Sequence, residues 1–330
     1  MSPTLSFLLV AAAAAGGSYV LPEPPALTVL GERGSSFDEP SSPADFSVSA
    51  GQLVGANGRL QPGGALELGP RALGLTRPIT YGRYQSSAAL RALTRSYLSF
   101  ATASRLQKNG KESVLGGIGL RSVLWGGADP LLDTGYLKAA TTARETCQAM
   151  LSSPDPAVVA GYAACVEGAY AQSAANLVAP PWNAPGVVLS TAASFGFGGG
   201  RLSRGGAERL SGGLSGAVPL GPAAQGGLSL GWLHSFRAAP DRFDSAAMVR
   251  FGAQRTRVKV EGGARVPTDP AAGVIYPVLL GGELQVAEDA WLALDFGLRI
   301  HPQRDAVQML SGLSFQWGQS SKPSFAPELP

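Results

Sequence analysis

The chain has 330 residues and a net charge of +3, from 26 basic and 23 acidic side chains. So small an excess argues against nucleic acid as a partner, and a hydrophobic fraction of 45% argues against a disordered chain. Only 15% of the residues are charged and 44 are glycine, respectively fewer and more than soluble domains usually contain.

The N-terminus is typical of a secretory signal peptide over residues 1–17. Leu5 begins a short apolar run, which leads into five alanines from Ala11 to Ala15 and then two glycines. The run is too short for a transmembrane helix, and its small residues suit a cleavage site. No Lys or Arg precedes the apolar run, which departs from the usual pattern.

Residues 18–62 form a Pro- and Gly-rich segment, a composition that breaks up regular structure, and part of this segment is expected inside a lumen. Within them, Phe46, Val48 and Ala50 alternate with small polar residues, which predicts either a first strand or a segment inside a lumen. Similar alternation predicts strands at residues 65–75, 90–102 and 114–125. The last two strands flank an Asn-Gly pair at positions 109 and 110, a strong hairpin signal.

Residues 127–185 are Ala-rich with helical spacing of their apolar residues, which predicts helices at 135–151 and 156–177. Asp155 and Pro156 suit the N-cap and the first position of the second helix. Cys147 and Cys165 would staple the two helices if they form a disulfide; the alternative is two buried free thiols. The insertion is either a functional cap, plug or partner surface, or a stable loop without a role.

The period-two pattern then resumes and continues to residue 318. In residues 289–301 every even position from Leu292 to Ile300 is apolar, and the odd positions include Asp295 and Arg299. With the earlier segments this predicts about twelve strands (ten to fourteen) of about ten residues each, the length of tilted membrane-spanning strands. The segments after the insertion are 187–197, 210–220, 225–237, 244–255, 256–266, 278–286, 289–301 and 307–318.

Such strands fit either a soluble β-sandwich or a membrane β-barrel. A sandwich would bury large residues from both sheets in one core, whereas here the positions opposite the apolar faces hold Gly, Ser, Ala and charged residues. Aromatic residues near strand ends suit the girdle of a membrane barrel. The girdle candidates are Trp232, Phe236, Phe315 and Trp317.

Residues 187–318, with the hairpin at 90–125 and the Ala-rich leader, resemble a bacterial outer-membrane β-barrel of the porin or channel-like class. The resemblance implies an all-β, antiparallel up-and-down transmembrane barrel over residues 63–318, with the helical hairpin inserted. It also implies the outer membrane of a diderm bacterium as location, with membrane lipid and the barrel-assembly machinery as partners. Such barrels often end on an aromatic residue; here Phe315 or Trp317 precedes a polar tail over residues 319–330.

The sequence predicts no enzyme and no cofactor or metal site. His234 and Ser235 are adjacent, and lipid hydrolases of the barrel type use a His and a Ser at neighbouring barrel positions. Neighbours in a strand point to opposite faces, however, so these two side chains would not meet. His301 ends its strand and is expected at a rim.

The functional candidates are instead the charged residues expected to line the lumen. Their cationic excess predicts a passive channel for small solutes with a preference for anions. The alternative is that these charges pair across strands and fill a narrow barrel. The residues are Arg121, Arg237, Arg250, Arg257, Lys259, Glu261, Arg265, Glu283, Asp295 and Arg299, with Glu67.

A second hypothesis for the function is a non-transporting anchor whose helical insertion binds a partner. Because long loops of such barrels cluster outside the cell, we expect the insertion on the outer side.

Overall fold

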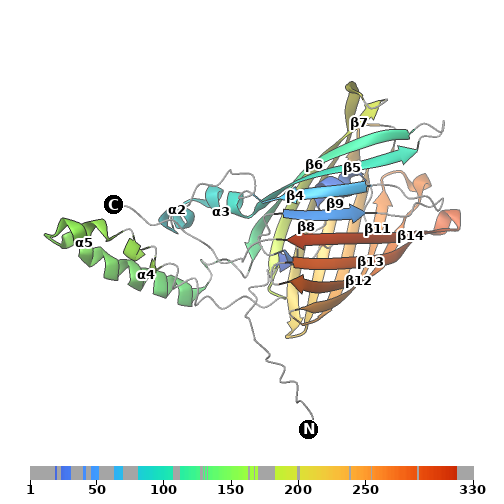
Figure 1. Cartoon of the computed structure of the whole chain (residues 1–330). Coiled ribbons are helices and arrows are strands. Elements are labelled where there is room, and N and C mark those ends of the chain that lie inside the picture. Colours follow the sequence, from blue (N-terminus) through green and yellow to red (C-terminus); the bar gives the residue numbers. More distant parts are fainter. Residues whose placement is uncertain are drawn as a thin grey trace, which may run out of the picture.

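The structure is a computed structural model of the whole chain (Figure 1). It describes residues 19–20, 24–30, 40–41, 46–51, 63–69, 81–106, 112–126, 129, 131, 133–162, 164–166, 168–169, 183–198, 201–237, 239–253, 255–287 and 290–317. The predicted signal peptide, the Asn-Gly turn and the C-terminal tail lie outside these residues.

Twelve antiparallel strands form one closed ring, in which each strand pairs with its neighbours in chain order and β14 pairs with β3. The strand ranges are β3 (Phe46–Gly51), β4 (Gly63–Leu68), β5 (Ser96–Leu106), β6 (Glu112–Gly126), β7 (Gly186–Gly198), β8 (Arg201–Gly221), β9 (Ala224–Ser235), β10 (Arg242–Gly252), β11 (Thr256–Pro267), β12 (Tyr276–Ala287), β13 (Ala290–His301) and β14 (Ala306–Trp317). The ring confirms the predicted up-and-down barrel and its strand number.

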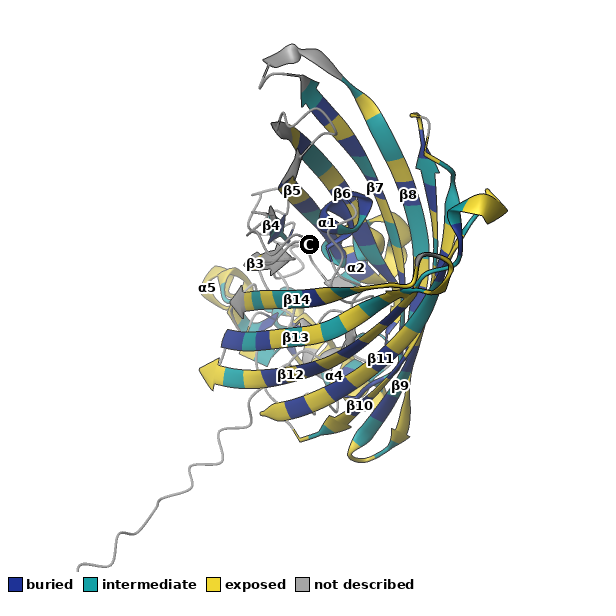
Figure 2. Ribbon diagram, turned by 90° about the vertical axis from the view of Figure 1, so that its right-hand side faces the viewer, coloured by how far each residue is buried: buried dark blue, intermediate teal, exposed yellow. Residues whose placement is uncertain are grey.

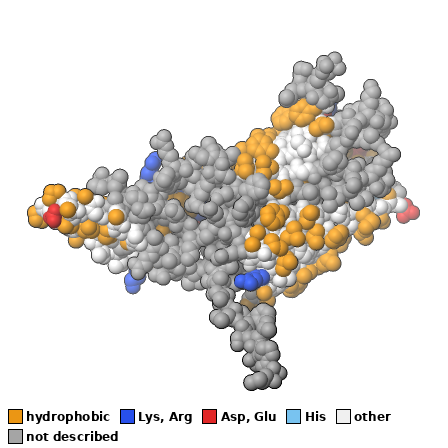
Figure 3. Space-filling model, viewed as in Figure 1, with side chains coloured by type: hydrophobic (Ala, Val, Ile, Leu, Met, Phe, Trp, Pro, Cys, Tyr) orange, Lys and Arg blue, Asp and Glu red, His pale blue; other side chains and the backbone are white. Residues whose placement is uncertain are grey.

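The outer face of the barrel is apolar because the alternation in each strand is kept in the ring. Met309 and Leu228 are 72% and 67% exposed, and residues of the other parity are mostly buried (Figure 2). Hydrophobic side chains cover much of the barrel wall visible in the space-filling view (Figure 3). A closed barrel with an apolar exterior is the outer-membrane type, so the chain is an outer-membrane β-barrel protein.

One predicted strand begins later than its pattern indicated. Residues 90–102 were expected to be a strand, but Ala88–Thr94 form helix α3, capped by the Ser87 hydroxyl, which accepts from the Leu90 N–H at 3.3 Å. The strand β5 begins only at Ser96. A side-chain cap followed by an Ala- and Leu-rich turn favours helix over the weak alternation of these few residues.

The helical insertion follows β6 and projects away from the barrel (Figure 1). It contains α4 (Thr134–Gln148), the 3-10 turn η2 (Ala149–Ser152) and α5 (Pro156–Ala160). Asp155 caps α5 by accepting from the Ala157 N–H at 2.8 Å, and Pro156 begins the helix, as predicted. The predicted disulfide between Cys147 and Cys165 is present. The insertion has a small hydrophobic core, in which Cys147 packs with Tyr136 and Tyr162.

Several smaller elements complete the described chain. No helix among the described residues is both long and apolar enough to cross a membrane. These smaller elements are β1 (Tyr19–Val20) paired with β2 (Pro40–Ser41), the helices α1 (Pro25–Leu30) and α2 (Tyr81–Ser86), and the 3-10 turns η3 (Pro270–Ala272) and η4 (Pro302–Arg304). Of these, α1 lies inside the barrel against the wall formed by β5 to β8 (Figure 2).

Candidate functional site

The barrel interior carries a concentration of charged side chains on β10 to β13. Alternation turns one residue in two inward, and on these strands the inward positions are unusually rich in Arg, Lys, Glu and Asp. Those with at most 4% of their surface exposed are Arg250, Arg257, Lys259, Glu261, Arg265 and Glu283. Charges so deeply buried need partners, because an unpaired buried charge is costly.

Glu283 lies between two arginines and is the centre of the largest charge cluster. One of its carboxylate oxygens is 2.7 Å from Arg250 Nη2 and the other is 3.6 Å from Arg257 Nη1. Arg257 is the direct register partner of Glu283 across β11 and β12, and its guanidinium also stacks over the Trp291 ring at 4.1 Å. The two arginines therefore share one carboxylate, and an aromatic face contributes a cation–π contact.

Lys259 and Asp295 form a second pair even though a whole strand separates them. The Lys259 Nζ lies 3.1 Å from Asp295 Oδ1, and the strand between them contributes Gly281, the register partner of both residues. A Cβ on Gly281 would lie 2.2 Å from Asp295 Oδ1 and 2.5 Å from Lys259 Cε. The pair forms because this position has no side chain.

A third ion pair lies on the opposite wall of the barrel. Arg121 on β6 donates to Glu67 on β4, and both side chains are almost fully buried. The Arg121 guanidinium also lies over the Tyr97 ring, 5.3 Å from its centroid. The two residues belong to strands that are separated by β5, so this pair also reaches across an intervening strand.

The other residues predicted for the lumen occupy different surroundings. Arg299 is partly buried on β13 and donates to Gln308 Oε1 at 3.2 Å. Arg237 follows the end of β9, so it lies at the rim; its side chain is 59% exposed and pairs with Glu208 at 3.0 Å. The structure thus brings together Arg250, Arg257 and Glu283, and separately Lys259 and Asp295, while Arg237 lies apart.

Of the residues predicted for an aromatic girdle, two lie at the end of β9. Trp232 and Phe236 are exposed on the outer face, and His234 lies between them with ring centroids at 5.8 and 4.7 Å. Phe315 on β14 is also exposed, whereas the side chain of Trp317, the last residue of β14, lies outside the described part.

His234 belongs to the rim and pairs with the carboxylate of Asp241. Its Nδ1 is 2.9 Å from the Asp241 carboxylate, which also accepts from the Ser235 N–H at 3.0 Å. These two hydrogen bonds lower the pKa of Asp241, and the one with His234 has the larger effect. The Ser235 side chain is buried on the opposite face, so the two residues do not form a nucleophile and base pair.

A polar cluster fixes the helices at the barrel end from which the insertion projects. Arg95 Nη2 donates to the Tyr84 hydroxyl at 2.7 Å and pairs with Asp129, and Tyr84 donates to Asp129 Oδ1 at 3.2 Å. Burial raises the pKa of Tyr84 to about 12. Tyr84 thus stays neutral and joins α2 to the residues that flank β5 and β6.

No protein-family model and no curated protein matches the chain. Among solved structures, it is similar to a KdgM porin in complex with disordered oligogalacturonate, at 6% identity over 82% of this chain and 97% of that chain, with a TM-score of 0.40. It is also similar to the CymD monoaromatic hydrocarbon channel (9% identity, 91% and 98% covered, TM-score 0.38). A third is the outer membrane protein Omp33 of Acinetobacter baumannii (9% identity, 83% and 98% covered, TM-score 0.35). Similarity this low is not evidence for a shared solute.

Several inward residues of importance were missed by the sequence reasoning. Trp291, on which Arg257 stacks, has an odd number like Asp295, and the odd-numbered residues of β13 face inward. Trp291 precedes Leu292, where the regular alternation of apolar and polar residues begins. Leu279 and Leu310 are also inward, each 2% exposed, so the interior contains large apolar side chains as well as charges. The Lys259 pairing through Gly281 was not foreseen either, although a glycine in a strand interior signals close approach of other groups.

Within the described residues, no group of His, Cys, Asp and Glu side chains is placed to hold a metal ion.

Proposed function

We propose that this protein is a passive channel of the outer membrane for small solutes. The observation that carries the proposal is the chemistry of the inner face, which has charged pairs on both walls. A barrel that served only as an anchor could fill its interior with apolar side chains instead. Buried ion pairs stabilise a fold no better than well-packed apolar residues do, so their presence favours a role in transport.

The finer part of the proposal is a preference for anions. Of the residues predicted for the lumen, six inward cations stand beside four inward carboxylates: Arg121, Arg250, Arg257, Lys259, Arg265 and Arg299 beside Glu67, Glu261, Glu283 and Asp295. The excess is modest because the pairs neutralise much of it. A residual positive potential along β10 to β13 would attract anionic solutes and repel cations.

Planar-bilayer recording of the purified protein in a salt gradient tests both parts. We expect discrete channel events and a reversal potential whose sign shows that anions pass more readily than cations. Arg299→Gln should shift that potential towards cations and Asp295→Asn further towards anions, with the lipid-facing Leu294→Ala as control. Absence of channel events contradicts the channel, and cation selectivity of the native protein contradicts the anion preference.

The helical insertion supports a second role, in which it binds a partner. It has its own disulfide and small core and lies outside the barrel, so it is not built as a plug. It leaves the barrel at the end where β3 begins and β14 finishes. Three connections at that end are short, residues 222–223, 253–255 and 288–289, whereas the connection from β4 to β5, which contains α2 and α3, is long. Short turns are typical of the periplasmic side. On the three short turns we propose a periplasmic position for the insertion, whereas the sequence favoured the outer side.

Replacing residues 131–182 by a short linker separates the two roles, because Asp129 and Asn183, which hold neighbouring segments, remain. A channel whose insertion only binds a partner should keep its conductance and lose the partner. Altered conductance of the shortened protein would contradict this division of labour.

A further inference from the structure

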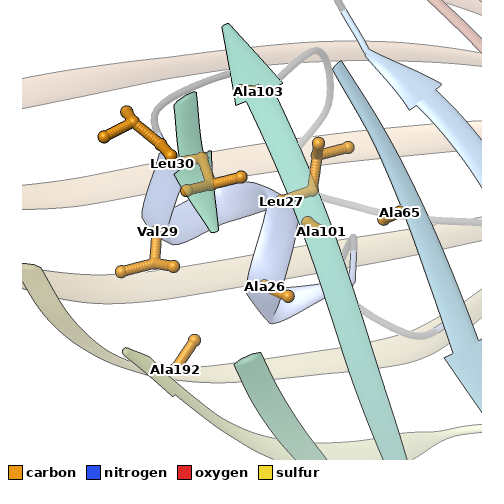
Figure 4. Close-up of a cluster of buried hydrophobic side chains, with 9 residues drawn as sticks. Ala26, Leu27, Val29, Leu30, Ala65, Ala101, Ala103 and Ala192 are labelled. Carbon is orange, nitrogen blue, oxygen red and sulfur yellow. The ribbon is translucent and has the colours of Figure 1, made fainter. Parts of the chain in front are cut away.

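The short helix α1 is lodged inside the barrel. Ala26, Leu27 and Val29 have no exposed surface, and they pack with Leu30 against four alanines and one leucine of the wall (Figure 4). These wall residues are Ala65, Ala101, Ala103, Leu115 and Ala192. Six residues are too few for a stable isolated helix in water, so α1 depends on this contact with the barrel.

Two glycines of β6 let the helix backbone touch the wall. A Cβ on Gly117 would lie 2.6 Å from the Ala26 carbonyl oxygen, and one on Gly119 would lie 2.6 Å from the Ala26 nitrogen and 2.8 Å from Pro25 Cγ. Real side chains do not approach backbone atoms so closely, so any other residue would push α1 away. The inward positions of β6 are therefore shaped to the helix.

Hydrogen bonds from the wall hold both ends of α1. Ser99 Oγ accepts from the Ala26 N–H at 3.2 Å, and Arg209 Nη1 donates to the carbonyl oxygens of Val29 and Leu30 at 3.4 and 3.0 Å. The terminal N–H and C=O groups of a helix have no partners within it. Strands β5 and β8 supply these partners, which makes the seat of α1 specific in position and direction.

A small cleft, with about 30 Å³ of space, remains beside α1 against strands β7 to β10. Its lining includes Thr28 of α1, Ser211, Ser215 and Ser229 of the wall, and the carboxylate of Asp244. The Ser215 hydroxyl donates to Ser229 Oγ at 3.0 Å. Hydroxyl groups both donate and accept hydrogen bonds, so this surface suits solutes that carry hydroxyl or amide groups.

We propose that α1 is the resident constriction of the barrel: it occupies the lumen beside β5 to β8 and directs solutes past the hydroxyl-lined cleft between Thr28 and Ser229. The preferred solutes are small and rich in hydrogen-bonding groups. The size limit rests on the proposed channel function, whereas the docking of α1 does not.

The test is a Gly117→Leu/Gly119→Leu double variant, which fills the seat of α1, compared with Gly262→Leu, where an added Cβ meets nothing within 4 Å. Liposome swelling with uncharged sugars of graded size should show a larger size limit for the double variant. Single-channel conductance should rise by about twofold or more, since conductance follows the width of the narrowest part of a pore. Unchanged size limit and conductance would overturn the constriction.

A thiol introduced as Ala26→Cys gives a readout that does not depend on transport. A membrane-impermeant maleimide should label it slowly in the native barrel and at least about tenfold faster in the double variant, because labelling requires exposure of the thiol. If no form conducts but labelling behaves this way, the channel function fails while α1 docking holds. Fast labelling in the native barrel overturns the docking.

Should the double variant not fold, Arg209→Gln provides a version without added volume. It removes the guanidinium that holds the Val29 and Leu30 carbonyl groups. The same increase in labelling and conductance is expected, to a smaller extent, and an unchanged pair of readouts counts against the proposal.

Discussion

The two walls of the barrel interior are filled in different ways. On the β5 to β8 side, Gly and Ala face inward beneath a separate segment of the chain, α1, and the same side also holds the Arg121–Glu67 pair. On the β10 to β13 side the strands fill the space themselves, with long charged side chains that pair across the sheet. Helix α1 can leave its place without breaking a strand, whereas the charged side chains belong to the strands themselves.

This difference predicts where the stability of the barrel lies. Removing one residue of a charged pair leaves a buried charge without that partner inside the barrel. The free energy of unfolding of the whole barrel should therefore fall. Weakening α1 affects a docked element, whose loss leaves every strand pair intact. In both places, glycine marks where another group approaches a strand closely: Gly281 under the Lys259–Asp295 pair, and Gly119 under α1.

The largest effect is expected from Glu283→Ala. The change leaves Arg250 and Arg257, which are 0% and 1% exposed, without their shared carboxylate. A buried pair broken in this way costs about 3–5 kcal/mol. Urea unfolding in lipid vesicles measures the loss, with Leu284→Ala on the outer face as control. A loss below about 1 kcal/mol would mean that water reaches the two arginines and screens them.

Gly281→Leu should come next. Its side chain would occupy the space through which Lys259 reaches Asp295, adding overpacking to a broken ion pair, with an expected loss of about 2–4 kcal/mol. The adjacent Gly282→Leu is the matched control, because its Cβ meets nothing within 4 Å. Equal stability of the two variants in the same unfolding assay would show that the pair contributes nothing.

Leu27→Ala tests the other wall, and its effect should be local. Leu27 is fully buried in the contact between α1 and the wall, and a truncation of this kind costs about 2–5 kcal/mol of packing. We expect this loss in the docking of α1, seen as faster labelling of Ala26→Cys, with no change in the unfolding midpoint of the barrel. Thr28→Ala, at a less buried position, is the control. A lower barrel midpoint would contradict the separation of the two fillings.

The barrel could be predicted from sequence because lipid imposes a simple rule on it. Each lipid-facing position must be apolar, so strands such as β11 and β13 show their faces directly in the residue order. The insertion was predictable for the opposite reason, since its helical spacing, the Asp155–Pro156 start and the two cysteines differ sharply from the strands.

The contents of the lumen could not be predicted in the same way. The burial of α1 depends on contacts with strands that are distant in the sequence, such as that of Ala26 with Ser99, 73 positions away, and no local pattern indicates them. Part of residues 18–62 was expected inside the lumen, but the residues around Pro24 and Pro25 indicated a break in regular structure and not the helix α1. Likewise, alternation turned Lys259 and Asp295 inward, but their pairing depends on the ring register that aligns both with Gly281.

The smallest effect is expected at the rim, away from both α1 and the charged pairs of β10 to β13. His234 and the Ser235 N–H hold the Asp241 carboxylate and lower its pKa below the ordinary 3.8. A group with a depressed folded pKa stabilises above its unfolded pKa, and this contribution disappears as the pH falls through the folded value. Asp241→Asn should therefore lower stability slightly at neutral pH and by less near pH 3, because Asp241 of the unfolded state becomes protonated below its ordinary pKa of 3.8. Unfolding midpoints at the two pH values measure the difference. An equal loss at both values would show that Asp241 acts through its shape and hydrogen bonds, and its charge would then play no part in joining β9 to β10.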